Sequence, residues 1–341
     1  MPELSATPAS PQAEKRAVLL LAHGTPDSVE QIPEYLRNIT SGRPLAEAVV
    51  EEIRHRYSLI GPSPLTRLTM EQARLLEGAL GLPVYVGMRN WKPYIGEVVA
   101  KMRSDGVTAA VAICLAPQNS RTSVGLYRRA AFAEAGNRIA LEFVDNWAGH
   151  PMLAQAFAER LLPIWLRASS EAGRAVPVVF TAHSVPCRTI QSHPVPGEPA
   201  ANDSLPPDSY PEDAKRTAAN VAARLAPSGL SAGGWFFAFQ SQGMSGGPWI
   251  GPTVEDTLTA LASEGHHSVV LQPVGFLCDH VEILYDIDIA FRGFAAKLGL
   301  ELTRAPSLND SPLLIETLAD LARQGVASLD ATREAFAVRS A

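Results

Sequence analysis

Residues 17–26 read Ala-Val-Leu-Leu-Leu-Ala-His-Gly-Thr-Pro, and residues 178–186 read Val-Val-Phe-Thr-Ala-His-Ser-Val-Pro. Each segment is a short apolar run that ends in Ala-His and is followed closely by a proline. Apolar runs of this length are typical of strands that are buried on both faces of a parallel sheet. The likeness predicts two similar halves, with His23 and His183 at equivalent strand ends. The alternative is chance similarity between two apolar strands.

A second pair of apolar runs supports this division. Val111–Pro117 and Val269–Pro273 both end at a proline. Pro117 follows His23 by 94 residues (117 − 23), and Pro273 follows His183 by 90 residues (273 − 183). Ligands bind at the carboxyl edge of open parallel sheets, so a cleft between the halves would present both imidazoles to one ligand. Imidazole binds Fe, Zn, Cu and Ni and accepts a proton near pH 7.

Apolar runs alternate with segments of helical periodicity, which predicts an α/β fold with parallel sheets covered by helices on both faces. The expected strands are Ala17–Ala22, Val84–Val86, Val107–Leu115, Ile139–Val144, Val178–Ala182, Trp235–Phe239 and Ser268–Gln272. The expected helices are Leu45–Tyr57, Met70–Leu80, Ile95–Met102, Met152–Ala168, Ala214–Leu225 and Val254–Ala262. Residues 191–211, which contain six prolines, are expected to form an irregular surface segment.

Length and composition bound the class of protein. The 341 residues suffice for two domains, and 46% apolar with 19% charged residues is typical of a globular rather than a disordered chain. The net charge of −6 argues against nucleic-acid binding. Cys114, Cys187 and Cys278 form no CxxC pair, which argues against a disulfide framework and a cysteine-held metal site. No signal peptide is evident and no apolar run approaches the roughly 18 residues that span a bilayer, so we expect a cytoplasmic protein without a transmembrane segment.

A second candidate site lies in residues 279–288, Asp-His-Val-Glu-Ile-Leu-Tyr-Asp-Ile-Asp, which follow the last apolar run. Asp279 is a favourable N-cap for a helix that begins at the next residue. Glu282 and Asp286 are four residues apart, so a helix places both carboxylates on one face. The pattern indicates either a set of oxygen ligands that leads a divalent cation toward His183, or a capped helix with a solvated acidic face.

Other signals are weaker. Arginine recognises carboxylates through two parallel hydrogen bonds, but a single arginine is as readily a surface ion-pair partner. No glycine-rich nucleotide-binding pattern follows a strand and no G-x-S-x-G turn is present, so neither nucleotide binding nor serine hydrolysis is supported. The remaining candidates for binding are Arg56, Tyr57, Ser63, Arg89, Arg121 and Tyr127.

Taken together, these segments resemble the ferrochelatase family from about Ala17 to Leu321. The resemblance rests on the order and spacing of several motifs, each of which is weak alone. They are Ala22–Pro26 (Ala-His-Gly-Thr-Pro), Gly61–Leu65 (Gly-Pro-Ser-Pro-Leu), Leu115–Ser120 (Leu-Ala-Pro-Gln-Asn-Ser), Thr181–Pro186 (Thr-Ala-His-Ser-Val-Pro), Gln240–Gly243 (Gln-Ser-Gln-Gly), Pro248–Pro252 (Pro-Trp-Ile-Gly-Pro) and Pro273–Glu282.

The resemblance implies a fold. It consists of two similar Rossmann-like halves, each with a four-stranded parallel sheet flanked by helices, and a porphyrin cleft between them. We expect a flexible N-terminus over residues 1–16, a first half over 17–150, a second half over 151–325 and a C-terminal tail over 326–341. The last helix is expected to pack back on the first half.

The resemblance also implies an enzyme, a lyase of haem biosynthesis that inserts ferrous iron into a porphyrin. His183 and Glu282 match the family's catalytic and metal-binding residues, and which of them accepts a proton and which binds iron stays open. Asp286 is a weaker metal-ligand candidate, and Ala290 stands where the family has a further carboxylate. His23 replaces a tyrosine that commonly faces the iron and is a candidate axial ligand. Iron is a substrate of this reaction, so we expect no resident cofactor and no iron–sulfur cluster.

The closest likeness is to the soluble enzymes that use coproporphyrin III, because no long apolar lip follows the first strand. The alternatives are a protoporphyrin IX enzyme, a non-catalytic tetrapyrrole or metal carrier of the same fold, and a chelatase of the cobalt or nickel group. Expected partners are the porphyrin, Fe(II) and neighbouring haem-pathway enzymes. The substrate-binding residues implied by this likeness are His23, Thr25, Arg43, Arg56, Tyr57, Ser63 and Tyr127.

Overall fold

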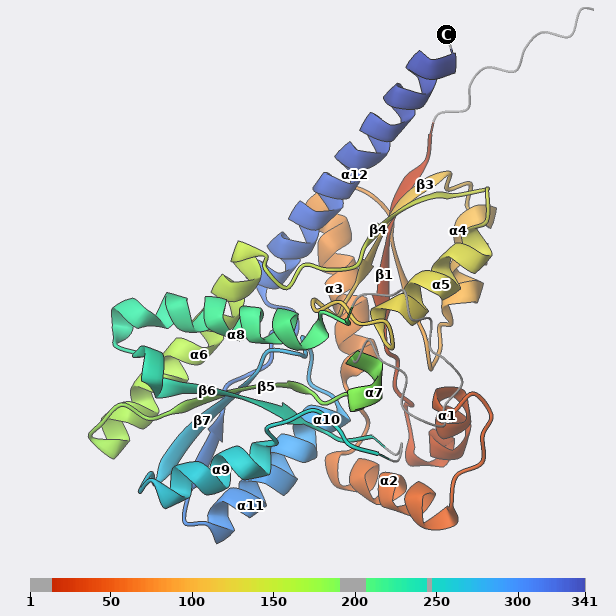
Figure 1. The fold of residues 1–341 in the computed structure, drawn as a ribbon. Helices are drawn as coiled ribbons and strands as arrows, with labels where there is room; N and C mark the ends of the chain where they lie inside the picture. Colours follow the sequence, from red (N-terminus) through yellow and green to blue (C-terminus); the bar gives the residue numbers. More distant parts are fainter. Residues whose placement is uncertain (1–13, 191–206, 244–246, 341) are drawn as a thin grey trace, which may run out of the picture.

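The computed structural model describes residues 14–190, 207–243 and 247–340, which form two α/β halves (Figure 1). Each half contains a four-stranded parallel sheet, with the strand order β2-β1-β3-β4 in the first and β6-β5-β7-β8 in the second. β1 and β5 therefore occupy the same interior position, which confirms the repeat that the two Ala-His segments predict. The strands are β1 (Arg16–Ala22), β2 (Val84–Met88), β3 (Ala109–Cys114), β4 (Ala140–Val144), β5 (Val178–His183), β6 (Trp235–Gln240), β7 (Ser268–Pro273) and β8 (Glu301–Arg304).

Helices connect the strands and cover both faces of each sheet. They are α1 (Ile32–Ile39), α2 (Glu47–Ile60), α3 (Leu65–Leu80), α4 (Ile95–Ser104), α5 (Val124–Ala135), α6 (Pro151–Ala172), α7 (Cys187–Ile190), α8 (Tyr210–Leu225), α9 (Val254–Ser263), α10 (Val281–Leu284), a π-helix at Asp286–Phe291, α11 (Arg292–Lys297) and α12 (Pro312–Ser340). The first sheet lies between α4 with α5 on one face and α3 with α12 on the other. The second lies between α9 with α11 and α6 with α8.

One continuous core joins the two halves. Leu20 of β1 and Phe180 of β5 belong to the same cluster of fully buried apolar side chains, together with Phe157 of α6 and Leu318 of α12. Burial of apolar surface from both sides therefore fixes the two sheets relative to each other. α12 itself packs on α3, β3 and β4 of the first half and on α6 of the second. The boundary expected between residues 325 and 326 falls inside this helix.

Several segments differ from the sequence prediction. β8 is a four-residue edge strand with one buried side chain, Leu302, so it leaves no apolar run in the sequence. α5 was also not predicted, and alanine fills two of its four buried positions, which weakens its apolar stripe. β1 begins at Arg16, inside the stretch expected to be flexible, whereas residues 1–13 lie outside the described residues. α8 begins at Tyr210, inside the segment expected to be irregular, of which residues 191–206 are not described.

A small apolar layer formed by α1 and α2 touches both halves. Ile32, Tyr35 and Tyr57 are buried there with Trp91, which follows β2. Val281 of α10 packs against the same cluster. The first half therefore contacts the turn of helix that carries the predicted acidic site.

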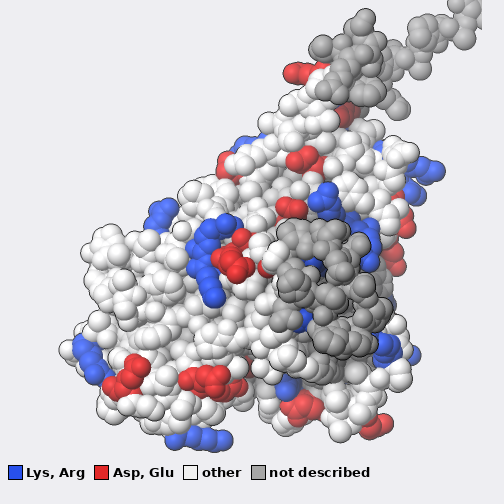
Figure 2. All heavy atoms as spheres, in the orientation of Figure 1, with Lys and Arg blue, Asp and Glu red and all other residues white. Residues whose placement is uncertain are grey.

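The surface and the helices give two further observations. On the face drawn in Figure 2, the described Lys and Arg residues form small groups among Asp and Glu rather than one extended basic area. This distribution agrees with the net charge of −6. Within the described ranges, none of the helices combines the length and the apolar character needed to cross a bilayer.

Candidate active site

A cavity of about 330 Å³ lies between the two halves. Its walls include residues within two positions of the ends of β1, β3, β5 and β7, so both sheets contribute their carboxyl edges. This is the edge at which open parallel sheets bind ligands. The volume falls within the range of about 300–1,000 Å³ that is usual for small-molecule sites.

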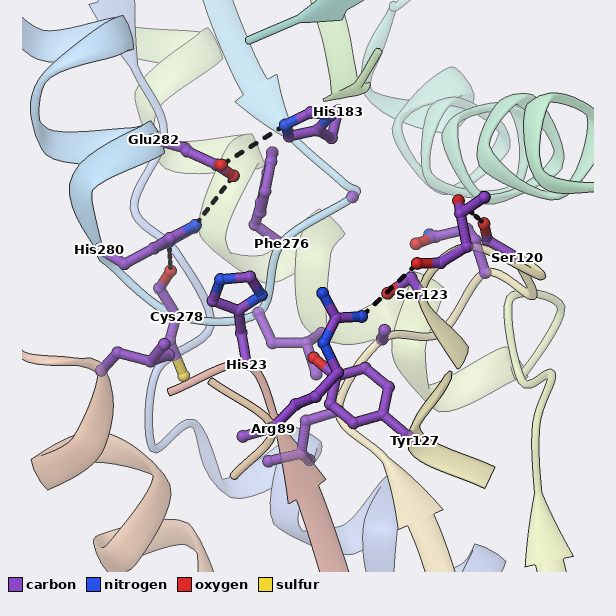
Figure 3. Close-up of a pocket in the computed structure, with 18 of the residues that line it drawn as sticks. His23, Arg89, Ser120, Ser123, Tyr127, His183, Phe276, Cys278, His280 and Glu282 are labelled. Atoms are coloured by element: carbon purple, nitrogen blue, oxygen red, sulfur yellow. Dashed lines mark hydrogen bonds and ion pairs between the residues drawn. The ribbon is translucent and has the colours of Figure 1, made fainter. Parts of the chain in front are cut away.

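Three side chains form a connected chain in one wall of the cavity (Figure 3). Nε2 of His183, at the end of β5, lies 3.4 Å from Oε1 of Glu282 in α10. Nε2 of His280 lies 3.3 Å from Oε2 of the same carboxylate. The side chains of His183 and Glu282 are 30% and 33% exposed, so both remain accessible from the cavity. We call His183, Glu282 and His280 the histidine–glutamate chain.

Hydrogen bonds to carbonyl oxygens locate the ring protons in this chain. Nδ1 of His280 lies 2.9 Å from the carbonyl oxygen of Cys278, and Nδ1 of His183 contacts the carbonyl oxygen of Ser184. A carbonyl oxygen only accepts, so each Nδ1 carries a hydrogen. In the neutral rings both Nε2 atoms are therefore acceptors, and both face the Glu282 carboxylate. Three acceptor groups in contact with one another favour the uptake of protons between them.

The electrostatics of the pair agree with this geometry. Burial alone would lower the pKa of His183, but the Glu282 carboxylate raises that pKa above its usual value. Burial alone would raise the pKa of Glu282, but His183 and His280 hold it well below its usual value. Glu282 is consequently ionised at neutral pH, and His183 is more basic than an exposed imidazole. The arrangement is that of a proton acceptor which can also offer lone pairs to a metal ion.

Contacts at the strand ends orient Glu282 and His183. Gln240, at the end of β6, donates from Nε2 to the carbonyl oxygen of Glu282 at 2.8 Å. Gly275, in the loop after β7, lies against the end of β5. A Cβ at this position would come within 2.7 Å of Cα of Ala182, the neighbour of His183, so a larger residue would displace the strand end.

His23 enters the cavity from the first half. Burial and the charge of Arg89 lower its pKa to about 3, so its imidazole is neutral at physiological pH. Nε2 of His23 lies 3.1 Å from the hydroxyl of Tyr35 and 3.1 Å from Nδ2 of Asn90. Neutral imidazole is the form that binds metal ions. The predicted role of His23 as an axial ligand stays a prediction, because Tyr35 and Asn90 contact its Nε2 in the structure.

A second wall of the cavity is polar and carries the positive charge. The guanidinium of Arg89 lies over the ring of Tyr127, with Cζ 5.4 Å from the ring centroid. Hydroxyl side chains from the loop before α5 line the cavity beside it (Figure 3). We call this set the polar wall: Arg89, Ser120, Thr122, Ser123 and Tyr127.

Six of the candidate site residues named from the sequence line the cavity, namely His23, Thr25, Arg89, Tyr127, His183 and Glu282. Thr25 is 1% exposed, and its hydroxyl has no hydrogen-bond partner among the described residues. Burial of an unpaired hydroxyl is unfavourable unless a ligand completes its hydrogen bonding.

The other predicted residues lie outside the cavity lining. Arg56 is engaged by carboxylates: Nε lies 3.0 Å from Oε1 of Glu52, and Nη1 lies 3.5 Å from Oδ1 of Asp286. Its guanidinium also lies over the ring of Tyr285 at 4.9 Å. These contacts bridge α2 to the second half, and the predicted role of Arg56 in substrate binding stays a prediction.

Arg43, Tyr57 and Ser63 also lie outside the cavity lining. Arg43 is exposed and donates from Nε to the carbonyl oxygen of Thr40 at 3.1 Å. Tyr57 is buried in the α1–α2 layer. Ser63 precedes α3, where its hydroxyl accepts a long contact of 3.5 Å from the backbone nitrogen of Leu65. Their predicted roles in substrate binding stay predictions.

The acidic segment departs from a simple capped helix. The helix begins at Val281, and Asp279 is not its cap. The carboxylate of Asp279 instead accepts hydrogen bonds from Arg304 at 3.1 Å, Ser307 at 2.7 Å and Asn309 at 3.0 Å. Sequence reasoning failed here because all three donors follow Asp279 by 25 residues or more.

Asp286 begins the π-helix that follows α10, so Glu282 and Asp286 do not lie on one regular α-helix. The hydroxyl of Ser241 donates to Asp286. Burial, together with the charge of Glu282, raises the pKa of Asp286 to about 6. Within the described residues, no three His, Cys, Asp or Glu side chains are grouped closely enough to hold a metal ion. The predicted ligand role of Asp286 therefore stays a prediction.

The cavity also contains aromatic and imidazole groups that the sequence analysis did not single out. Phe276 lies between two members of the histidine–glutamate chain, with ring centroids 6.4 Å from His183 and 5.0 Å from His280. Tyr210 donates from its hydroxyl to the carbonyl oxygen of His183 at 2.9 Å. His280 could have been found from sequence, because it stands two residues before Glu282 in the motif that carries the resemblance.

Comparisons with known proteins agree with the fold and show the family. A sequence model described as Ferrochelatase matches residues 15–326. The chain is 64% identical over 319 residues to the ferrochelatase of Acidobacterium capsulatum, a match that covers 94% of this chain and 97% of that protein. It is 31% identical over 318 residues to the coproporphyrin III ferrochelatase of a Geobacillus species, with 90% and 96% coverage.

Solved structures show the same fold at low sequence identity. The chelatase SirB of Bacillus subtilis with Fe³⁺ superposes with a TM-score of 0.56 at 10% identity, covering 93% of this chain and 98% of that one. The cobalt complex of the sirohydrochlorin chelatase SirB gives 0.51 at 12% identity, with 91% and 95% coverage. At such identities the likeness concerns the fold alone.

Proposed function

Because the chain belongs to the ferrochelatase family, we propose that it inserts Fe(II) into coproporphyrin III to give Fe-coproporphyrin III. It is a ferrochelatase, and the general reaction is metal insertion into a porphyrin during haem synthesis. The observation that carries the proposal is the histidine–glutamate chain, which faces a cavity whose other wall is polar. The identity of the porphyrin is the proposed part.

The reaction needs a proton acceptor, because the porphyrin loses two pyrrole protons as it takes up the iron. We assign this role to the histidine–glutamate chain. Nε2 of His183 is an acceptor and is made more basic by Glu282. One proton that leaves the ring can therefore settle between Nε2 of His183 and the carboxylate, and the second between the carboxylate and Nε2 of His280, where each relieves the repulsion of two acceptors. The same lone pairs can hold Fe(II) briefly before the ring nitrogens replace them.

Coproporphyrin III carries four carboxylates, whereas protoporphyrin IX carries two. The polar wall and the unpaired hydroxyl of Thr25 support a substrate that brings anionic groups into the cavity. Relatives at 31–32% identity bear the name coproporphyrin III ferrochelatase, although the relative at 64% is named only ferrochelatase. On these grounds the four-carboxylate substrate is preferred.

Steady-state kinetics under anaerobic conditions test the substrate. The rates of Fe(II) insertion into coproporphyrin III and into protoporphyrin IX are followed by absorbance with the same enzyme preparation. We expect kcat/KM for coproporphyrin III to be at least tenfold higher, which corresponds to about 1.4 kcal/mol of transition-state binding. A preference for protoporphyrin IX would refute the proposed substrate.

Substitution of the proton acceptor tests the mechanism. The His183→Ala variant keeps Glu282 but loses the imidazole that faces it. We expect the rate of iron insertion to fall by about 10²–10⁴-fold, which is the range for loss of a general base. His55→Ala is the matched control, because His55 is exposed on α2 and outside the cavity lining. Normal insertion by His183→Ala would contradict the assignment.

Three further features belong to the same proposal. The enzyme works without a resident cofactor or an iron–sulfur cluster, and iron is only its substrate. The cytoplasm is the proposed compartment, on the cysteine pattern of the sequence. Neighbouring enzymes of the haem pathway are proposed to supply the porphyrin and to receive the product.

A further inference from the structure

We infer that Arg89 binds a carboxylate on the rim of the macrocycle and thereby sets the orientation of the ring in the cavity. The inference rests on the proposed function, and it assigns a substrate contact to a residue outside the set Arg43, Arg56, Tyr57 and Ser63. None of those four lines the cavity, whereas Arg89 does. Among the described residues that line the cavity, Arg89 is the one Lys or Arg side chain.

Among the residues that the structure describes, two hydrogen bonds engage Arg89 and leave most of its donors free. A guanidinium carries five N–H donors in a planar fork. Within the described residues, Nε donates to Oδ1 of Asn90 at 3.3 Å and Nη1 donates to the carbonyl oxygen of Thr122 at 3.5 Å. Both contacts are long for N–H···O bonds, and neither acceptor carries a charge. The described residues form no ion pair with Arg89, in contrast to Arg56.

Arg89 is half-buried and has no carboxylate partner in the part of the chain that the structure describes, so its charge is unpaired there. Arginine stays protonated at all physiological pH values, so it cannot relieve its burial by losing a proton. Its planar fork matches a carboxylate through two parallel hydrogen bonds. The ring of Tyr127 supports one face of the guanidinium, which holds the fork in place and leaves its edge available.

The opposite charges of the two cavity walls set the orientation of a bound macrocycle. Glu282 repels a carboxylate from one wall, and Arg89 attracts it to the other. Both charges act on His23, which lies in the cavity with them. A macrocycle therefore enters with a carboxylate-bearing edge toward Arg89 and with its ring nitrogens toward the histidine–glutamate chain. Hydroxyl groups of Ser120, Thr122 and Ser123 line the cavity on the same side and can donate hydrogen bonds to the bound carboxylate.

Binding of metal-free porphyrin tests this inference without catalysis. Fluorescence titration measures the Kd of coproporphyrin III and of its tetramethyl ester at one fixed concentration of non-ionic detergent. In the wild-type protein we expect the free acid to bind more tightly than the ester. In Arg89→Gln we expect about a tenfold loss of affinity for the free acid and little change for the ester, because only the acid offers a charged partner. Arg89→Lys keeps the charge and should recover part of the loss.

The control is Arg128→Gln. Arg128 also stacks on aromatic rings, with Cζ 5.4 Å from the centroid of Phe132, but it lies outside the cavity lining. The affinity of the Arg128→Gln variant for coproporphyrin III and for its tetramethyl ester should equal that of the wild type. An equal loss for acid and ester in Arg89→Gln would show a structural role only and would overturn the inference.

Arg89 could also bind the carboxylate of a small free acid instead of a carboxylate on the macrocycle. Calorimetry with citrate alone separates the two cases, and we expect no Arg89-dependent binding at micromolar concentrations. Such binding, together with equal affinity for acid and ester, would overturn the assignment to the macrocycle. The proposed substrate fails separately, through a preference for protoporphyrin IX in iron insertion by the wild-type enzyme.

Discussion

Glu282 lies between two imidazoles whose Nδ1 atoms are already committed to carbonyl oxygens. Each Nε2 is therefore a hydrogen-bond acceptor that faces another acceptor, the Glu282 carboxylate. A proton placed between them stabilises both groups, because it forms a hydrogen bond where two acceptors had repelled each other. The three side chains act as a unit rather than as one base and one ligand. This explains why the separate roles of His183 and Glu282 cannot be assigned from residue identity alone.

Replacement of the carboxylate should therefore change the titration of its neighbour. In Glu282→Gln the charge that raises the pKa of His183 is removed, whereas the burial that lowers this pKa remains. We expect the pKa of His183 to fall. Proton NMR of the His183 ring in metal-free protein measures the shift directly and needs no activity.

The direction of the linked effect on stability follows from the same shift. A histidine whose folded pKa is raised stabilises the fold below its unfolded pKa, and this stabilisation disappears as pH rises through the folded value. Relative to the wild type, Glu282→Gln should lose stabilisation most on the acid side of this range. His183→Ala is the spectral control that assigns the resonance, and an unchanged His183 pKa in Glu282→Gln would contradict the coupling.

At the scale of elements, one loop decides where His280 and Glu282 lie. Asn309 clamps it: Oδ1 accepts from the backbone nitrogen of Asp279 at 2.9 Å, and Nδ2 donates to Oδ2 of Asp279 at 3.0 Å. The backbone nitrogen of Asn309 also donates to the carbonyl oxygen of Leu277 at 2.8 Å. The segment before α12 thus fixes the approach to α10.

Loss of this clamp should impair turnover more than binding. Asn309 has a φ of +50°, so Asn309→Gly removes the side-chain hydrogen bonds without backbone strain. We expect kcat for iron insertion to fall about tenfold or more because the histidine–glutamate chain loses its orientation, with KM for porphyrin nearly unchanged. Ser41→Gly, at a φ of +53° in an exposed turn, is the control for added glycine flexibility. Equal falls in kcat in both variants would refute the positioning role.

The elements also show what the sequence can and cannot predict. The strands that lead to His23 and His183 were predictable, because the apolar run and the reactive side chain stand next to each other in the chain. Arg56 could not be placed, because its partner Asp286 comes from the other half. The position of Arg89 in the cavity depends on how β2 pairs with β1, and the formation of β8 depends on its pairing with β7. Neither feature produces a pattern in the neighbouring sequence from which it could be predicted.

At the scale of the whole molecule, the cavity depends on the fixed relation of the two sheets. The sequence predicted the repeat and the α/β class, since both arise from patterns within each half. The resemblance also implied that the last helix packs back on the first half, and α12 does contact α3, β3 and β4. Its contact with α6 of the second half, which makes it the joint between the halves, was not predicted. Such a helix reads in the sequence like any other amphipathic segment.

Gly325 allows α12 to approach β3 closely. A Cβ at Gly325 of α12 would lie 2.6 Å from Cγ1 of Val111, a fully buried residue of β3 that cannot rotate away. Gly325→Ala should therefore lower the free energy of unfolding by roughly 1–3 kcal/mol. Gly78→Ala, exposed in α3 with no atom near its added Cβ, should instead add up to about 1 kcal/mol. Thermal melts followed by circular dichroism measure both, and Gly325→Ala should melt in one cooperative step at lower temperature, because α12 belongs to the core of both halves. A melting temperature at or above that of the wild type would show that α12 does not hold the sheets together.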